Sequence, residues 1–509
     1  MLNFVDNFLN KTTMYRVVLY VLIFFFGASL VLSLFGFLPY SPTDLISSLL
    51  IILLISWITN IIFSFFYDAP TNTESIYITA LILFFLITPI QSGIYSQFLP
   101  FAFWASVWAM ASKYILAIKG KHIFNPAAFA VALTALTINQ SASWWIGTPN
   151  MLPFVLIGGF LIIRKIRRAD LFFAFLISAF TTISVLAMFR GSDIMTTLMR
   201  TMTDSAFFFF AFVMLTEPLT APTTKWLRIA FGALVGFLFA PALHFGIFYS
   251  TPELALVIGN IFAYIVSPKE KLFLKLKDRI KVGVDTYDFI FEKDKNFNFR
   301  PGQYMEWTLK HRSPDTRGNR RYFTLASSPT EDEIHLGVKF YPEPSSFKNH
   351  LLAMPEGGGI IAAQKSGDFV LPEDSEKDLV FIAGGIGITP FRSMIKYLLD
   401  KKQKRTITLL YSNKTTKDIA YKEVFDRARA ELGIKTVYVI TGKGEAVFEE
   451  SMQKGSIDAR MIEKEIPNYL NKTFYISGPR GMVDAFENTL KSIGVSRKNI
   501  KTDFFPGFA

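Results

Sequence analysis

The 509-residue sequence contains no cysteine and only five histidines. The lack of cysteine excludes disulfides, thiolate-bound zinc, iron–sulfur clusters with the usual cysteine ligands and a cysteine nucleophile. Of the histidines, only His122 and His244 precede residue 268. The topology predicted below places them near opposite membrane faces, so they cannot share one haem iron, and two haems would need more axial ligands. We therefore expect no haem, no iron–sulfur cluster and no other bound metal.

Charged residues are scarce in the first half of the chain. Hydrophobic residues make up 51% of the sequence and concentrate before residue 268, whereas most charged residues follow it. We expect a polytopic transmembrane domain over residues 1–268 and a soluble part after it. Basic loops beside the bilayer account for much of the formal net charge of +12, so no nucleic-acid partner is expected.

Apolar stretches at ten places are candidate membrane spans. They lie near residues 16–38, 44–66, 76–90, 97–117, 125–138, 151–164, 170–189, 205–216, 227–245 and 251–267. The first lacks a small-residue cleavage site and is long enough to cross a bilayer, so no cleavable signal peptide is expected. Several others fall short of the ~20 residues that a straight spanning helix needs. Their prolines indicate interrupted helices.

The distribution of lysine and arginine predicts the orientation in the membrane. With the N-terminus inside, the outer loops contain only Arg190 and Arg200. The inner loops contain Lys119, Lys121, Arg164, Lys165, Arg167, Arg168, Lys225 and Arg228. We therefore predict a multi-pass protein of the cell inner (plasma) membrane, surrounded by lipid, with both termini in the cytoplasm.

Proline-marked segments recur five spans apart. Ile87-Thr88-Pro89-Ile90 closes the third span and Thr216-Glu217-Pro218-Leu219 closes the eighth. Asn125-Pro126-Ala127-Ala128 opens the fifth and Thr251-Pro252-Glu253-Leu254 opens the tenth. A repeat with an odd number of spans inserts with opposite orientation, which predicts an inverted repeat with sites where interrupted helices face each other. The alternative is that proline only marks helix ends.

The soluble part contains an ordered series of motifs. Arg321-Tyr322-Phe323-Thr324 ends a strand-like run, and its spacing is expected to place an arginine fork and a hydroxyl on one side of the strand. Phe381–Pro390 follows as a strand with a glycine turn that opens a helix, as in sites that hold a dinucleotide pyrophosphate. Tyr475–Pro479 and Phe504–Phe508 come last.

Together with Pro301-Gly302-Gln303-Tyr304, these motifs resemble the ferredoxin–NADP reductase superfamily over roughly residues 272–509. The resemblance implies an FAD-binding antiparallel β-barrel over 272–372 and an NAD(P)-binding α/β domain over 376–509. It also implies that Arg321 contacts the FAD phosphates, that Phe323 flanks the isoalloxazine beside Tyr322, and that Thr324 bonds its reactive edge. Ser345 and Ser346 would add backbone N–H groups to the pyrophosphate.

The same resemblance implies the nucleotide site and the catalytic residues. The implied NAD(P) residues are Gly384, Gly385, Gly387, Thr389, Pro390, Asn413, Gly478 and Pro479, and the implied catalytic residues are Thr324, Ser477 and Phe508. Two positions depart from the family pattern, because Phe323 replaces the usual tyrosine and Ser477 the usual cysteine. The choice between NADH and NADPH stays open, since Lys414 suits a 2′-phosphate while Asn413-Lys414-Thr415 is similar to the Asn-x-Thr of NADH-using relatives.

Two membrane stretches, Lys121–Phe129 and Phe212–Thr223, combine polar groups with prolines, and such backbone is tolerated only inside protein or against a cavity. They resemble membrane flavin subunits B and D of the sodium-translocating NADH:quinone reductase and the Rnf complex, over roughly residues 70–267. The resemblance implies an inner-leaflet flavin site, here with Asn125, Pro126, Glu217 and Thr220.

In that family a second flavin, FMN, is attached to a threonine of an outer Gly-Ala-Thr motif. The matching loop, Ser141–Pro149, keeps Gly147-Thr148 but not the full motif. We therefore expect Thr148 to hold FMN or riboflavin without a covalent bond, or to hold none. Trp144 and Trp145 are candidates to stack on such a ring, and the alternative is an interfacial aromatic belt.

The sequence therefore predicts a multidomain membrane protein that acts as an NAD(P)H-dependent flavin oxidoreductase. Its ten-span helical bundle with an inverted repeat would precede the β-barrel FAD domain and the α/β nucleotide domain. We expect electrons to pass from cytoplasmic NAD(P)H through FAD and membrane flavin to an acceptor at the outer face, either a flavoprotein or a small molecule. Two alternatives stay open: an NAD(P)H:quinone reductase within the membrane, and a transporter regulated by the reductase module.

Overall fold

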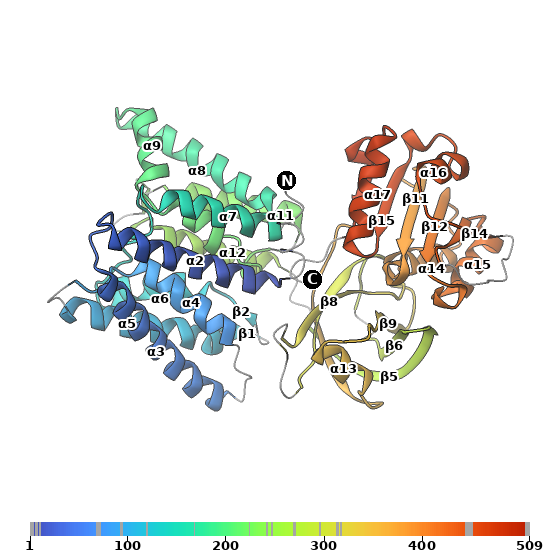
Figure 1. The fold of residues 1–509 in the computed structure, drawn as a ribbon, viewed down its shortest axis with the longest axis horizontal. Coiled ribbons are helices and arrows are strands. Elements are labelled where there is room, and N and C mark those ends of the chain that lie inside the picture. Colours follow the sequence, from blue (N-terminus) through green and yellow to red (C-terminus); the bar gives the residue numbers. More distant parts are fainter. Residues whose placement is uncertain are drawn as a thin grey trace. The chain divides into compact units, whose positions relative to one another are not determined.

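The computed structural model describes most of the chain and divides it into two compact units. The described residues are 5, 9, 12–67, 73–91, 95–118, 121–166, 168–222, 224–240, 243–245, 248–267, 271–294, 297–311, 315, 318–442 and 451–503. One unit contains Met1–Ser267 and the other Pro268–Phe505 (Figure 1). The first is almost entirely helical, and the second is built on two β-sheets.

The first unit consists of helices with two short hairpins between them. The helices are α2 (Met14–Leu34), α3 (Pro42–Phe66), α4 (Thr73–Leu86), α5 (Tyr95–Ile115), α6 (Pro126–Thr137), α7 (Leu152–Ile166), α8 (Ala169–Phe189), α9 (Ile194–Thr203), α10 (Phe207–Phe209), the π-helix η1 (Phe210–Met214), α11 (Lys225–Leu238) and α12 (Pro252–Val266). The hairpins pair β1 (Ala117–Ile118) with β2 (Lys121–His122), and β3 (His244–Phe245) with β4 (Phe248–Tyr249).

Several helices in this unit begin at a capping side chain. Asn125 caps α6 by accepting a hydrogen bond from the Ala128 N–H at 3.0 Å, and Pro126 occupies the first turn. Thr251 caps α12 in the same way, with Pro252 in its first turn. Ser41 and Asp44 form a reciprocal capping box at the start of α3. Local sequence therefore sets the helix starts on which the sites depend.

Helices occur at all ten predicted positions, but they differ in length. By length and composition, α2, α3 and α8 are able to cross a membrane, and α4, α6 and α12 are shorter apolar helices. The number of membrane crossings therefore stays a prediction. Helix α9 was not predicted, and its Asp193 cap and threonine-rich, largely exposed surface account for a polar helix between apolar ones.

The order of elements occurs twice in the first unit. Helices α2 to α5, hairpin β1–β2 and α6 are followed by α7, α8, α10–η1, α11, hairpin β3–β4 and α12, with α9 as an insertion. Each hairpin directly precedes a capped helix that starts with proline. The proline-marked segments therefore occupy matching places in two runs of similar elements.

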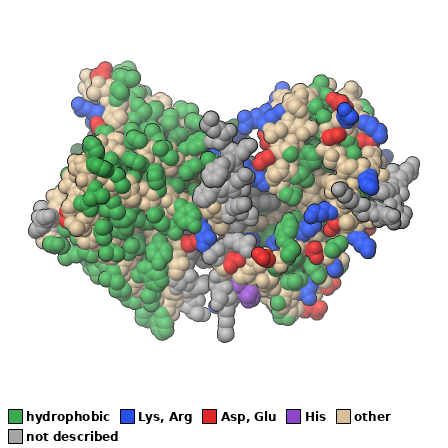
Figure 2. Space-filling view, in the orientation of Figure 1, with side chains coloured by type: hydrophobic (Ala, Val, Ile, Leu, Met, Phe, Trp, Pro, Cys, Tyr) green, Lys and Arg blue, Asp and Glu red, His purple; other side chains and the backbone are tan. Residues whose placement is uncertain are grey.

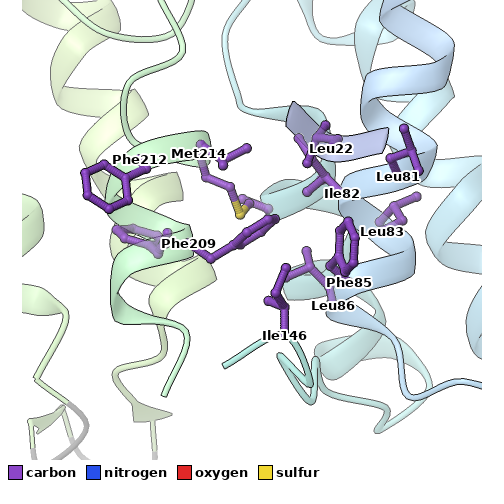
Figure 3. Close-up of a cluster of buried hydrophobic side chains, with 14 of the residues drawn as sticks. Leu22, Leu81, Ile82, Leu83, Phe85, Leu86, Ile146, Phe209, Phe212 and Met214 are labelled. Atoms are coloured by element: carbon purple, nitrogen blue, oxygen red, sulfur yellow. The ribbon is translucent and has the colours of Figure 1, made fainter. Parts of the chain in front are cut away.

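Glycines and aromatic rings hold the helices of this unit together. Gly232 and Gly236 of α11 face the Leu171 and Phe175 carbonyls of α8, where a side chain would clash. Figure 3 shows side chains of α2, α4 and α10–η1, among them Phe85 and Phe209, pointing toward one another in the core. On the face shown in Figure 2, the side chains of this unit are largely hydrophobic, whereas charged side chains are more frequent on the second unit. This distribution suits a lipid-facing helical unit.

The first sheet of the second unit is antiparallel. Its strands are β5 (Lys271–Gly283), β6 (Thr286–Glu292), β7 (Tyr304–Thr308), β8 (Arg320–Thr324), β9 (Glu333–Lys339) and β10 (Gly359–Ser366), in the order β8-β7-β10-β5-β6-β9, and α13 (Ser346–Leu352) adjoins it. The Ala326 N–H, just beyond β8, donates to the His335 carbonyl of β9 at 2.9 Å. Among the described strands, β8 and β9 nevertheless form the two edges, so the predicted antiparallel β-barrel is not confirmed.

The second sheet is parallel and carries helices on both faces. Its strands are β11 (Leu379–Gly384), β12 (Ile407–Asn413), β13 (Lys435–Ile440), β14 (Met452–Lys454), β15 (Thr473–Ser477) and β16 (Ile500–Thr502), in the order β14-β13-β12-β11-β15-β16. Helices α14 (Thr389–Asp400) and α15 (Lys422–Leu432) pack on one face, and α16 (Ala459–Glu465) and α17 (Arg480–Ser492) on the other. The strand order reverses between β11 and β15, which is where open α/β sheets bind nucleotides.

Candidate functional site

Strand β8 presents its site residues on alternate faces. Arg321 and Phe323 both contact the Phe347 ring of α13, at 5.3 Å from the guanidinium carbon and 6.0 Å between ring centroids. Tyr322 points the other way and donates to Glu306 at 2.9 Å. Because side chains alternate along a strand, Thr324 lies on the side of Tyr322. The prediction that the arginine fork and the hydroxyl share one side is therefore wrong.

Arg321 contributes to a group of anion-binding donors. Its Nη2 lies 3.6 Å from Asp315 Oδ1, and Asp315 Oδ2 accepts the Ser346 N–H at 3.1 Å at the start of α13. The Ser346 hydroxyl lies 3.1 Å from His311 Nε2. Ser345 is the buried N-cap and accepts the Lys348 N–H. A guanidinium and a backbone N–H thus converge on one carboxylate, and such a donor pair also suits phosphate.

Thr324 and Phe323 are fixed by the sheet itself. Thr324 is buried and pairs with Tyr304 across β7. The Phe323 carbonyl accepts a hydrogen bond from the Trp307 indole at 3.3 Å. The ring of Phe323 is only partly buried. Phe323 therefore leaves ring surface open on the same face as Arg321.

The predicted nucleotide turn follows β11 directly. Gly385 has φ +52° and no atom near the position a Cβ would take, so the backbone is open to a ligand there. The Tyr411 hydroxyl donates to the Gly385 carbonyl at 3.2 Å, and burial raises the pKa of Tyr411. Thr389 and Pro390 then open α14. The turn is therefore rigidly held yet accessible, as a pyrophosphate cradle requires.

Two glycine segments meet at the point where the strand order reverses. A Cβ on Gly387 would collide with the backbone of Ser477 and Gly478, so the turn after β11 and the end of β15 are in direct contact. Pro479 precedes α17, and the Ser477 hydroxyl donates to Asp503 at 3.0 Å. Asn413 ends β12 on the same edge of the sheet. The predicted nucleotide residues thus share one edge, while Phe508 lies outside the described residues.

Polar residues predicted for the inner membrane site form a connected cluster. Glu217 accepts hydrogen bonds from Asn125 Nδ2 at 2.9 Å and from the Thr220 hydroxyl at 3.1 Å. His122 Nε2 lies 3.4 Å from the other Glu217 oxygen. Asn260 of α12 accepts the Asn125 N–H at 2.8 Å and donates to the Thr220 carbonyl at 3.2 Å. The cluster lies where Pro126 opens α6 and where η1 ends.

The residues predicted for the outer site divide into two groups. Trp145 is buried against Tyr40, Phe84 and Phe85, and its indole donates to the Phe84 carbonyl at 2.6 Å. These contacts engage the Trp145 ring in the protein core, which leaves its neighbour as the more accessible of the two indoles.

That neighbour is Trp144, which is only partly buried and has φ +52°. Its indole donates to Glu253 Oε2 at 3.2 Å, and Glu253 is buried in the first turn of α12. The Thr148 hydroxyl oxygen is buried and has no hydrogen-bond partner among the described residues. Trp144, Thr148 and Glu253 are thus polar or aromatic groups with capacity for a ligand.

Sequence reasoning did not assign Asn260, Glu253 or Asp315 to a site. Asn260 and Glu253 are polar residues in an apolar helix, a signal that points to function inside membranes. Asp315 gives no such signal, because its loop contains other charged residues. Only the folded chain brings it to Arg321.

Comparison with known proteins gives separate matches for the N-terminal and the C-terminal part of the chain. The family model described as "NQR2, RnfD, RnfE family" matches residues 146–270, and that of the "Oxidoreductase NAD-binding domain" matches residues 381–488. A flavohemoprotein of Bacillus subtilis (strain 168) is 29% identical over 41% of this chain and 51% of its own length. The oxidoreductase NAD-binding domain-containing protein 1 of Bos taurus is 29% identical over 41% of this chain and 71% of its own.

Among solved structures, the cytochrome b5 reductase domain of Ulva prolifera nitrate reductase matches with a TM-score of 0.41 and 23% identity, over 46% of this chain and 98% of its own. The chain spans about half the length of the Bacillus flavohemoprotein that it matches. The protein thus carries an NQR2, RnfD, RnfE family domain in its N-terminal part and a ferredoxin reductase-like, FAD- and NAD-binding oxidoreductase module in its C-terminal part.

Proposed function

We propose that this protein carries electrons from cytoplasmic NAD(P)H, through FAD in the C-terminal module and flavin in the N-terminal unit, to an acceptor at the outer membrane face. The observation that carries the proposal is the cluster of Glu217, Asn125 and Thr220, which joins polar groups at two helix interruptions. Burying such polar groups in an apolar helical unit costs free energy, so their presence there points to a function.

The C-terminal module offers a fitting site for FAD. Arg321 and the Ser346 N–H already hold a carboxylate, that of Asp315, and the same donors suit a pyrophosphate. Phe323 offers ring surface beside them, and Thr324 ends the same strand. FAD, when bound, supplies the exchange between a two-electron hydride and single electrons. The protein's own residues bind and orient FAD and NAD(P)H, with the glycine turn after β11 as the NAD(P) site.

The inner cluster fits the polar edge of a flavin ring. A flavin ring edge carries both donors and acceptors, and Asn125, Thr220 and Glu217 offer an amide, a hydroxyl and a carboxylate. Each of these side chains is held by another member of the cluster, so the set is preorganised. Pro126 keeps the start of α6 in place.

The outer loop supports a second flavin at the opposite face. Trp144 offers an indole ring, Glu253 a buried carboxylate, and Thr148 a hydroxyl without a partner among the described residues. A hydrocarbon core of about 30 Å is too wide for one ring system, so electron transfer across it favours two carriers. We propose that FMN or riboflavin binds here without a covalent bond.

The proposed topology follows from the repeated order of elements. We propose ten spans arranged as an inverted repeat, with both termini in the cytoplasm and the protein in the plasma membrane. The domains would be a transmembrane flavin domain over 1–268, an FAD domain over 272–372 and a nucleotide domain over 376–509. In this arrangement hairpin β1–β2 faces inward beside the inner cluster, and hairpin β3–β4 faces outward.

Flavin counting and a sealed-vesicle assay test the function. Purified protein should release FAD and at least one further flavin, and FAD alone would favour a transporter regulated by the reductase module. In vesicles that expose the reductase module, NADH added outside should reduce ferricyanide trapped in the lumen without added quinone. A requirement for quinone would instead establish a quinone reductase.

A further inference from the structure

One buried arginine joins the nucleotide-binding helix to the segment that follows the flavin strand. Arg392 of α14 is 5% exposed. Its Nη1 donates to the Ala326 carbonyl at 3.0 Å, and its two terminal nitrogens form a bidentate pair with Glu331. Ala326 lies just beyond Thr324, the last residue of β8. Arg392 thus connects the two halves of the reductase module directly.

Ser393, the next residue, makes a second connection. Its hydroxyl donates to the Ser327 carbonyl at 2.6 Å and accepts the Gly302 N–H at 3.3 Å. Glu331 in turn accepts the Ser328 N–H at 2.6 Å, so the chain from Ala326 to Ser328 is held at each residue. Burial lowers the pKa of Arg392, but the Glu331 carboxylate outweighs this and raises it above its usual value. The Arg392 guanidinium therefore stays charged.

The position of this network bears on hydride transfer. Helix α14 begins at Thr389, directly after the glycine turn. The Ala326–Ser328 segment, which Arg392, Ser393 and Glu331 hold, begins just beyond Thr324. Any shift between them changes the distance between the bound nicotinamide and the flavin. Misplacement of reacting groups by about 1 Å can cost roughly 100-fold in rate.

We propose that Arg392 and Ser393 are positioning residues that set the register between the nicotinamide and the flavin through Glu331 and the Ala326–Ser328 backbone. The inference rests on NAD(P)H oxidation by FAD in the proposed function. That reaction breaks the C4–H bond of the dihydronicotinamide and transfers its hydrogen with both electrons to FAD, leaving NAD(P)⁺. Neither side chain takes part in the bond changes.

The test uses the full-length protein with Arg392→Lys and Ser393→Ala. Lysine keeps the charge but cannot hold Glu331 at two points and Ala326 together. Lys491→Ala is the matched control, because Lys491 forms an i,i+4 pair with Glu487 on α17, away from this network. The rate of FAD reduction by NADH is measured by stopped flow, together with its deuterium isotope effect with 4-deuterated NADH. The bound FAD per chain and the KM for NADH are measured on the same proteins.

Arg392→Lys should slow FAD reduction at saturating NADH by roughly 10- to 100-fold, with FAD content and KM within about twofold of wild type. The isotope effect in Arg392→Lys should be at least as large as in the wild type. Ser393→Ala should show a smaller loss of the FAD reduction rate. Unchanged reduction rates in both variants overturn the inference, as does a loss that only follows FAD content or KM. If wild-type FAD is not reduced by NADH, the proposed function itself fails, which is a separate result.

Discussion

Asn125 donates a hydrogen bond to Glu217 at 2.9 Å, although the two residues lie 92 positions apart. Asn125 caps α6, and Glu217 follows η1, so one bond joins two helix interruptions. The π-helix matters here, because its wider turn ends just before Glu217, and such turns occur frequently at functional sites. The bond is the structural basis of the proposed inner flavin site.

Asn125→Ala should weaken flavin binding in the N-terminal unit. The substitution leaves the partly buried Glu217 carboxylate without its amide donor, which costs about 1–3 kcal/mol, or roughly 5- to 150-fold in affinity. Flavin extracted per chain, corrected for FAD, measures the effect. Glu74→Gln is the control, because Glu74 pairs with Arg16 outside the cluster. Retention of all membrane flavin in Asn125→Ala would show that the Asn125–Glu217 pair does not contribute to flavin binding.

Arg321→Ala should release FAD, whereas Arg320→Ala should largely retain it. Arg321 is buried beside Asp315 and Ser346, but Arg320 is more exposed and faces Glu306. Hydrogen bonds to charged groups contribute about 1.5–3 kcal/mol each, so FAD affinity should fall by at least roughly tenfold. Titration of the apoprotein with FAD, followed by fluorescence quenching, gives both affinities. Equal losses in the two variants would contradict the assignment.

Asp315→Asn should tighten FAD binding. The Asp315 carboxylate competes with phosphate for Arg321 and for the Ser346 N–H, and the amide removes its charge. Because Asp315 is partly exposed, the gain should be about 0.5–1 kcal/mol, roughly two- to fivefold. The same titration measures it, with Asp332→Asn as a control on an exposed turn. Weaker FAD binding in Asp315→Asn would show that Asp315 supports the site instead of competing.

Gly387→Ala should disturb the nucleotide site, while Gly359→Ala should be tolerated. A methyl group on Gly387 meets the backbone of Ser477 and Gly478, and that on Gly359 meets open space. Overpacking of this kind costs about 1–3 kcal/mol. We expect a lower thermal midpoint and a higher KM for NADH only in Gly387→Ala. An unchanged KM for NADH in Gly387→Ala would show that this contact does not shape the nucleotide site.

Alkaline pH should destabilise the reductase module through Tyr475. Burial raises the pKa of Tyr475 to about 12, above the ~10 of an unfolded chain. The stability contributed by its neutral form is therefore complete below about pH 10 and is lost as the pH rises toward 12. Tyr475→Phe should lose the hydrogen bond to Val370 but show a shallower alkaline decline of the thermal midpoint. Parallel declines in both proteins would assign the alkaline transition to other groups.

Local features of the sequence determined much of the site. The glycine turn at Gly384–Gly387 and the proline-marked caps at Asn125 and Thr251 depend on neighbouring residues, so their motifs predicted them. The same holds for the division between an apolar helical half and a charged half. These patterns are short-range, and the physical chemistry that enforces them acts within a few residues.

Tertiary structure alone decided which distant groups meet. No local pattern brings Asp315 to Ser346, Glu253 to Trp144 or Arg392 to Glu331, because these contacts follow from packing between separate elements. Packing also placed Trp145 in the core, although it adjoins the partly open Trp144. The sequence thus determined which chemical groups are available at the proposed sites, and the fold decided their partners, since burial and hydrogen bonding between remote segments are settled only when the chain is folded.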